Sequence, residues 1–533
     1  MPPKTSLHCN QHAEHLKTQG NELFQQGQYK PAHRKYTEAI KADPGNAIYY
    51  ANRAACNLAM KEWATELDPN YAKAWSRLAT AAFHMSSYPK SINAWETALK
   101  CLPPVEQSSE TDKKLRAQFK AGLAQAKKAG EKPFVKEEHT RVYSEDAAKE
   151  LPWHRAAAME SEIVSQMKIS CAIVILQAYR EFKTAVEDMK KIKKIGEVNG
   201  RPRLYGKSGT LEGICNGIMS DPRVFHLDCT DWMIFEASAF NAWQDGGAKV
   251  VKAEAPKRLK REGWSKLRPA LSVTVRAWII AGFVGGSIGK YAAAMEYHSR
   301  ALEVLEWGER TWQNVPFTER GVMFRKTFIR AVKRMKLSSM HNCIVNNVEG
   351  VDFTVEDMAD LARDIITDVE ANPPLPEYPG EPLDLTFTFG YYIYPKAAAL
   401  STLAWHYMQL GHKATTADDA QAAYSQSADY YMQAAQIYPP DEEQMLIYYK
   451  VAVEAYWFSP EGKTLEEVLP TLMTIYERLP HVVRIWEHSA LASSRDSQVV
   501  YALDFMTRCG EALESGKITK KSFVRPKDMV SAV

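Results

Sequence analysis

Small and apolar residues recur at a regular spacing near the start of the chain. They are Leu16, Gly20, Leu23, Gly27, Tyr29, Ala32, Tyr36, Ala39 and Pro44. Steps of three and four residues place side chains on one face of a helix, and small residues let two helices approach closely. A glycine inside a helix lowers its stability, so we expect Gly20 at a helix–helix contact. The pattern predicts a pair of packed helices that ends at Pro44.

The same pattern returns further along the chain. Its members are Trp75, Leu78, Ala79, Tyr88, Ser91, Trp95, Ala98 and Pro103. This spacing is typical of the tetratricopeptide repeat (TPR), a helix–turn–helix unit of about 34 residues. A shortened copy lies between the two, because Pro69 follows Pro44 by only 25 residues. About nine residues of the repeat are therefore missing, from the turn and the start of its second helix.

Changes of pattern divide the chain into four segments. Residues 112–129 form an amphipathic basic helix that suits the cap of a repeat stack, so a TPR domain is predicted over 10–130. Residues 131–265 are predicted as a linker with an irregular and partly helical segment. A degenerate TPR-like helical array is expected over 266–500, and a C-terminal helix and tail over 501–533.

Weaker copies of the repeat indicate the second array. One comprises Trp278, Ala281, Gly282, Gly289, Tyr291, Ala294 and Ala301. The other comprises Leu400, Leu403, Ala404, Tyr407, Gly411, Ala428, Met432, Ala435 and Pro440, with an insertion around 412–423. Helical periodicity also marks 156–194, 446–457 and 464–480, whereas 195–265 has no clear period and no run alternates as strands do. The predicted fold class is all-α: a TPR solenoid at the N-terminus plus a second, degenerate TPR-like helical array.

The amino-acid composition excludes only a few classes of function. The 67 basic and 64 acidic residues leave a net charge of +3, which argues against bulk binding of nucleic acid. Eight cysteines form no C-x-x-C pair and we recognise no signal peptide, so we expect a reducing, cytoplasmic location. The basic runs 190–207 and 257–268 are also compatible with a nuclear signal or an acidic partner. The apolar stretch 270–289 contains Arg276, so we expect no membrane span.

Three short motifs suggest other chemistry. "GGSIG" matches the G-x-S-x-G turn of serine hydrolases, with Ser287 as nucleophile, but the repeat pattern explains more of the same residues. "GRPRLYGKS" has five residues between its glycines where a phosphate-binding loop has four, so a basic loop is preferred. His8, Cys9, His12 and His15 are spaced as metal ligands can be, but no second half-site is evident. We expect no cofactor and no metal.

Five polar residues fall on the first helices of the three N-terminal repeats. They are Lys17, Asn21, Asn52, Lys73 and Arg77. First helices line the concave groove of a TPR stack, so three cations and two amides would converge there. Such a set suits a carboxylate-rich peptide, because the cations neutralise its charge and the amides bond its carboxylate and backbone.

These residues carry a resemblance to a known family. "LKTQGNELF", "ANRAAC" and "YAKAWSR" contain the K-x3-N, N-R and K-x3-R motifs of carboxylate-clamp TPR co-chaperones, and residues 13–58 are similar to the small glutamine-rich and Hop-type members. The resemblance covers about residues 10–130. It implies a groove that binds the C-terminal Glu-Glu-Val-Asp of the 70-kDa and 90-kDa heat-shock chaperones through the five residues named above.

The sequence therefore predicts a non-enzymatic adaptor for protein–protein interaction, with heat-shock chaperone tails as partners and no nucleic acid or membrane. The partner of the second array is open. One alternative is a general TPR scaffold with a non-functional clamp. Loss of nine helical residues is about 2.5 turns and ~180° of rotation, which would turn Lys73 and Arg77 away from Asn52. A remote alternative is a serine hydrolase that uses Ser287.

Overall fold

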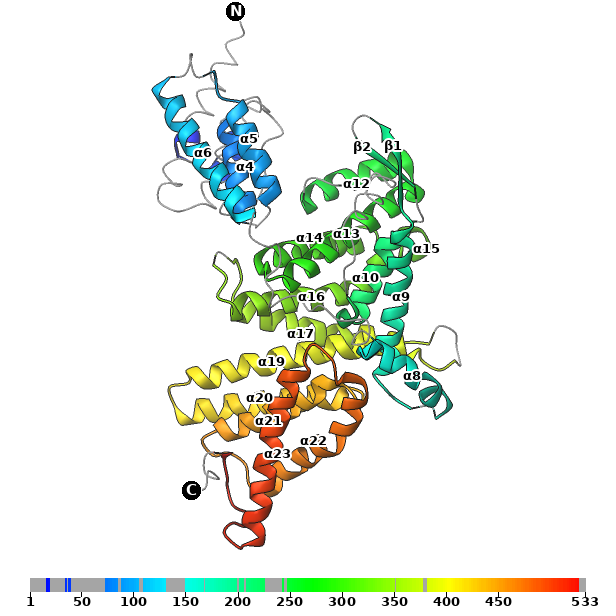
Figure 1. The fold of residues 1–533 in the computed structure, drawn as a ribbon, viewed down its shortest axis with the longest axis vertical. Helices are drawn as coiled ribbons and strands as arrows, with labels where there is room; N and C mark the ends of the chain where they lie inside the picture. The colour runs from blue at the N-terminus through cyan, green and yellow to red at the C-terminus, as the bar shows by residue number, and fades with distance from the viewer. Residues whose placement is uncertain are drawn as a thin grey trace, which may run out of the picture. The chain divides into compact units, whose positions relative to one another are not determined.

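Helices make up nearly all of the secondary structure in this computed structural model (Figure 1). It describes residues 16–19, 34–35, 37–39, 72–84, 88–104, 109–130, 149–166, 168–198, 201–205, 208–225, 242–243, 247–349, 351–376 and 381–526. The chain divides into two compact units. The first comprises residues 1–141 with 287–293, and the second comprises 142–286 with 294–533.

The described part of the first unit contains three packed helices. They are α4 (Ala72–His84), α5 (Tyr88–Lys100) and α6 (Glu110–Gly130). Ala79 and Ser91 are fully buried where α4 meets α5, and Ser91 Oγ donates a hydrogen bond to the carbonyl of Ala79 at 2.7 Å. Trp95 of α5 then packs on α6, with its ring 5.7 Å from that of Phe119. The third predicted repeat and the predicted capping helix are both present.

The second unit begins with a mixed segment. It contains α8 (Pro152–Ser165), α9 (Ala172–Lys190), β1 (Lys193–Val198), β2 (Arg201–Tyr205), α10 (Thr210–Ser220), the 3-10 turn η3 (Pro222–Val224) and α12 (Ala248–Glu262). β1 and β2 pair antiparallel, with a register shift between Lys194 and Gly196.

The middle of the second unit is built of longer helices. They are α13 (Trp264–Ser287), α14 (Tyr291–Thr311), α15 (Phe317–Arg320), the 3-10 turn η4 (Val322–Phe324), α16 (Lys326–Val345) and α17 (Val355–Ala371). Gly289, in the turn between α13 and α14, has a φ of 78°, which favours glycine. α17 begins with a capping box between Thr354 and Asp357.

The C-terminal helices form an array in which sequential neighbours pack together. They are α18 (Leu385–Thr388), the π-helical turn η5 (Phe389–Ile393), α19 (Tyr394–Lys413), α20 (Ala417–Ile437), α21 (Glu443–Phe458), α22 (Leu465–Trp486) and α23 (Ala492–Glu514). Ser427 Oγ of α20 donates to the carbonyl of Ala404 in α19 at 2.8 Å, as Ser91 does to Ala79 in the first unit. The same small-residue contact therefore recurs in both units.

The weak repeats of the second array are real helix pairs. Gly282 of α13 lies against His298 of α14, and a methyl group at position 282 would lie 2.6 Å from His298 Nε2. Gly411 of α19 lies against the ring of Tyr424 in α20. The prediction of small residues at these contacts is confirmed. The expected insertion at 412–423 is instead the end of α19, a short turn and the start of α20, which is capped by Thr416.

The helical periodicity of 156–194 corresponds to two helices, α8 and α9, because Ser170 and Asp441 hold a new helix start at Cys171. One prediction about the segment before residue 265 is wrong. The chain contains a β-hairpin where we expected no strand. The Asn-Gly dipeptide between the two strands is the sequence signal for such a hairpin.

The largest of three described hydrophobic clusters in the second unit joins both of its ends. Its buried members include Phe182, Ile214, Ile279, Leu305, Val332, Val453, Ile475 and Phe505, which come from α9, α10, α13, α14, α16, α21, α22 and α23. The boundary between the units at residue 141 falls inside the segment 131–265 that was predicted as a linker. The remainder of that segment belongs to the second unit.

Helix α13 is long and apolar enough to cross a membrane, judged by length and composition alone. However, 61% of its most apolar 18-residue stretch is buried inside the structure. Arg276, in the middle of α13, is buried and forms an ion pair with Glu212 of α10 at 2.8 Å. We interpret α13 as a core helix of the second unit.

We expect Gly411→Ala to destabilise the protein. Alanine in place of an interior helical glycine normally stabilises by up to ~1 kcal/mol. At Gly411, however, the new methyl group would lie 2.7 Å from the Tyr424 ring, and such overpacking costs about 1–3 kcal/mol. The control is Gly510→Ala in α23, where a methyl group meets nothing within 4 Å and should stabilise. Urea unfolding of both variants tests this, and equal shifts would contradict it.

We expect the folded protein to lose stability in mild acid because His298 is buried. Its ring is 3% exposed and contacts Ser339 Oγ at 2.9 Å and the Ile279 carbonyl at 3.3 Å. Burial lowers the pKa of His298 from 6.5 to about 4, although the Ile279 carbonyl opposes this. Because the pKa is lower in the folded state, the stabilisation is complete above pH 6.5 and is lost as the pH falls toward 4.

The matched variant is His298→Gln, which cannot titrate in this range. The free energy of unfolding of the native chain should fall between pH 7.5 and 4.5 by about 2–3 kcal/mol more than that of His298→Gln. Carboxylates titrate in both proteins and cancel in the comparison. Parallel loss of stability by both proteins would show that His298 is not the group responsible.

Candidate functional site

Lys73 is the most fully described residue of the predicted clamp. It lies in the first turn of α4, and its side chain is exposed. The opposite face of α4 is held by Ala72 and Ala79, which are buried against the neighbouring helix. No acidic residue lies in the first turn of α4, so the ammonium group and the positive helix end reinforce each other. This end of α4 is suited to a negatively charged group.

The other four clamp residues are described in part or not at all. Lys17 lies in a helical stretch at 16–19 and is half-buried beside the buried Leu16. Arg77 occupies the next turn of α4 after Lys73, and its side chain is outside the described structure. Asn21 and Asn52 lie outside the described residues. A groove that contains all five therefore stays a prediction.

The hydrolase alternative is wrong. A nucleophile elbow requires a strand that leads into Ser287. Residues 275–284 are instead helical, and Ser287 is the last residue of α13. The geometry is that of a helix–turn–helix, as the repeat pattern predicted.

The remaining motifs find no support as ligand sites. Residues 201–205, between the two glycines of "GRPRLYGKS", form strand β2 rather than a loop around a phosphate. The His8, Cys9, His12 and His15 group lies outside the described residues. Within the described ranges, no group of three or more His, Cys, Asp and Glu side chains could hold a metal ion.

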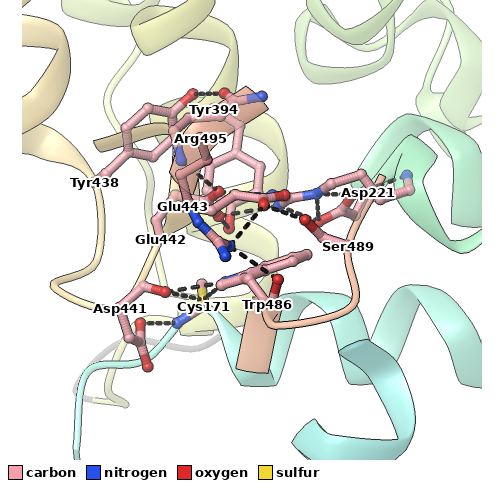
Figure 2. Close-up of polar contacts among 12 residues, drawn as sticks. Cys171, Asp221, Tyr394, Tyr438, Asp441, Glu442, Glu443, Trp486, Ser489 and Arg495 are labelled. Carbon is pink, nitrogen blue, oxygen red and sulfur yellow. Dashed lines mark hydrogen bonds and ion pairs between the residues drawn. The ribbon is translucent and has the colours of Figure 1, made fainter. Parts of the chain in front are cut away.

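A buried polar cluster, which sequence reasoning missed, lies in the second unit (Figure 2). Its centre is the loop between α20 and α21, where Asp441, Glu442 and Glu443 are all buried. The other members are Ser170, Cys171, Asp221, Arg223, Tyr394, Trp486, Ser489 and Arg495. We call this set the acidic-loop cluster.

Arg223 is the principal cation of the acidic-loop cluster. Its guanidinium lies 2.6 Å from Glu442, 2.7 Å from Asp221 and 3.2 Å from Glu443, and it stacks 3.8 Å above the ring of Trp486. Burial opposes its charge, but Asp221 and Glu442 outweigh burial and raise the pKa of Arg223 above its ordinary value. The planar guanidinium thus bridges three carboxylates and one aromatic face.

A second arginine and a helix end complete the cluster. Arg495 is fully buried, with Nη1 2.8 Å from the Trp486 carbonyl and 3.4 Å from Glu443. Asp441 Oδ1 accepts a hydrogen bond from the Cys171 backbone N–H at 2.8 Å, at the start of α9. Tyr394 donates its hydroxyl hydrogen to Glu442 at 2.9 Å. Figure 2 shows these side chains pointing toward one another from separate elements.

The acidic-loop cluster is suited to holding the helices of the second unit together and not to catalysis. Burial, together with Asp441 and Glu442, raises the pKa of Cys171 well above its usual value, so the thiol stays protonated and is a poor nucleophile. Burial also raises the pKa of Glu443, while Arg223 opposes this. The carboxylates are occupied by arginine, hydroxyl and backbone donors of the chain itself.

Comparisons with known proteins find that the sequence of this chain is similar to those of TPR co-chaperones. No protein-family model matches the chain. It is 38% identical over 106 residues to the small glutamine-rich tetratricopeptide repeat-containing protein 2 of Saccharomyces cerevisiae, which is 18% of this chain and 31% of that protein. It is 37% identical over 97 residues to Hsp70-Hsp90 organizing protein 1 of Glycine max, which is 16% of this chain and 17% of that protein.

A third relative, serine/threonine-protein phosphatase 5 of Mus musculus, is 32% identical over 138 residues, or 24% of this chain and 26% of that protein. The chain thus spans less than a third of the length of each relative. The solved TPR domain of P58(IPK) aligns with a TM-score of only 0.21 at 11% identity, too low to support a common arrangement. The sequence matches support a TPR protein that resembles the Hop-type co-chaperones over its repeat region.

We expect Arg223→Gln to destabilise the second unit strongly. The substitution would leave Asp221 and Glu442 buried without their cation, and loss of one partner of a buried ion pair costs about 3–5 kcal/mol. The matched control is Arg484→Gln, because Arg484 pairs with Glu162 at 2.8 Å on the surface and exposed pairs contribute at most ~1 kcal/mol. Urea unfolding at neutral pH measures both, and similar small losses would contradict a central role for Arg223.

Proposed function

We propose that this chain is a non-enzymatic adaptor that binds the acidic C-terminal peptide of heat-shock chaperones through its N-terminal TPR segment. The observation that carries the proposal is the combination of the five-residue motif with the similarity to Hsp70-Hsp90 organizing proteins. The proposed site residues are Lys17, Asn21, Asn52, Lys73 and Arg77. The partners would be chaperones of the 70-kDa and 90-kDa classes, in the cytoplasm.

The exposed position of Lys73 supports this proposal. A carboxylate at the N-terminal end of α4 would meet both the ammonium group of Lys73 and the backbone N–H groups of the first turn. A short peptide that ends in two glutamates and an aspartate offers several such carboxylates. Its affinity should depend on salt, because exposed charges are screened.

One alternative retains the adaptor but not the clamp. Repeat two is shortened by about nine residues, which would change the orientation of α4 relative to the first repeat if its helices continued without a break. The chain would then be a general TPR scaffold for a different partner. A peptide titration distinguishes the two functions.

We expect the full chain to bind an acetylated peptide that ends in Glu-Glu-Val-Asp, and the C-terminal amide of that peptide to bind much more weakly. Lys73→Ala should weaken binding roughly tenfold, or ~1.4 kcal/mol, because it removes one charge-assisted contact. The control is Lys120→Ala, which removes an exposed lysine from α6 in the same unit. Isothermal titration calorimetry at low and high salt measures the affinities.

Two results would contradict the clamp. The first is absence of binding by the folded chain, which would favour the scaffold alternative. The second is equal binding of acid and amide, or equal loss with Lys73→Ala and Lys120→Ala, which would indicate non-specific attraction.

A further inference from the structure

The connection between α17 and α18 is unusually long and rich in proline. It runs from 372 to 384 with the sequence "NPPLPEYPGEPLD". Connections between helices are commonly two to eight residues, and longer ones in compact domains are usually functional or disordered. The structure describes 372–376 and 381–384 of this connection. Residues 373–376, the Pro-Pro-Leu-Pro segment, lie wholly within the described part.

The Pro-Pro-Leu-Pro segment is restricted to an extended backbone. Each proline fixes its own φ, and the residue before a proline is kept out of the helical region. Pro373 and Leu375 both precede prolines, and the segment is neither helix nor strand. Within the described structure its backbone makes no hydrogen bond. These are the properties of a polyproline II helix, whose carbonyl groups remain available to a partner.

The apolar side chains of this region face solvent. Leu375 is 82% exposed, more than any other large hydrophobic residue that the structure describes. Leu383, Leu385 and Phe387, which follow in the same connection and in α18, are 37–41% exposed. Isolated exposed leucines are ordinary, but an exposed leucine between two prolines presents an apolar ridge of fixed shape.

The two ends of the connection are held by one buried arginine. Arg330 of α16 is 1% exposed, and its guanidinium donates to Asp368 Oδ2 at 2.8 Å and to the Tyr391 carbonyl at 2.9 Å. Asn372 Nδ2 bonds the Asp368 carbonyl at 3.0 Å. Asp384 accepts from the Phe387 backbone N–H at 3.1 Å and so caps α18. The base of the connection is therefore rigid, which lowers the entropy cost of binding.

Acidic residues predominate in the sequence on both sides of the segment. The sequence has no lysine or arginine between Arg363 and Lys396. Glu381 and Asp384 are both exposed beside the described part of the connection. A binding groove with an acidic rim would be repelled, whereas one with a basic rim would be attracted.

We propose that residues 373–376 are a docking ligand for a polyproline-binding domain. The partner would be a small domain whose groove is lined by aromatic side chains and rimmed by basic residues. Aromatic grooves bind polyproline II segments because the preformed helix loses little entropy and packs its proline rings on the aromatic faces. This interaction is separate from the proposed peptide clamp in the first unit.

The test uses the full chain fixed to a biosensor surface. The probes are a purified WW domain with a basic rim around its aromatic groove and a purified SH3 domain with an acidic rim. We expect the WW domain to bind more tightly than the SH3 domain. Pro373→Ala/Pro376→Ala and Leu375→Ala should each weaken binding at least about tenfold. A synthetic peptide of residues 370–385 should compete.

The matched control is Val500→Ala, which truncates a 65% exposed apolar side chain on α23 and should leave binding unchanged. Circular dichroism of the variants checks that the helices persist, as expected because the substituted residues lie outside helices or are exposed. Failure of the WW domain to bind would overturn the proposal. Binding that survives the proline substitutions, or that prefers the acidic-rimmed SH3 domain, would overturn it as well.

Discussion

The arrangement of the second unit depends on the burial of charge around Arg223. Removal of a carboxylate from water is costly, and three carboxylates lie within 3.2 Å of this one guanidinium. The cost is offset only if the arginine, Trp486 and the loop between α20 and α21 keep their present geometry. A neutral core of similar size would tolerate small displacements of these elements. The ion cluster does not, because each displaced carboxylate would lose its contact with the Arg223 guanidinium while it stays buried.

The same cluster explains where helices begin and end. Asp441 accepts hydrogen bonds at the start of α9, so its negative charge lies at the positive end of that helix. The polar break between α8 and α9 is thus stabilised by a residue about 270 positions away. Arg495 likewise bonds the carbonyl of Trp486 at the end of α22. The ends of two helices, α9 and α22, are therefore bonded by side chains that lie outside those helices.

Whether the sequence predicts a contact depends on how far apart its two residues lie along the chain. The helix pairs were predictable because residues such as Ala79 and Ser91 are only 12 residues apart and the spacing of the small residues is the signal. The acidic-loop cluster was not, because Arg223 and Glu442 are separated by 219 residues and charged residues are normally exposed. The hairpin was missed because its strands are polar, so that only the Asn-Gly dipeptide marks it. Among the five clamp residues, the spacing of Lys73 and Arg77 predicts a shared helix face, but their distance from Asn52 depends on the shortened repeat.

The buried polar groups and the exposed polar groups of the chain have different roles. The ionisable groups of the acidic-loop cluster bind one another, and burial keeps the Cys171 thiol protonated. The cluster therefore stabilises the fold. The two proposed partner sites lie on the surface: a lysine at a helix start in the first unit and a proline-rich segment between two helices in the second. Both are presented by rigid supports, namely the small-residue contact of Ala79 with Ser91 and the clasp of Arg330 on Asp368 and Tyr391. Since ordering a flexible ligand site costs free energy on binding, rigid supports are what an adaptor needs if short, weakly bound peptides and domains are to be held at all.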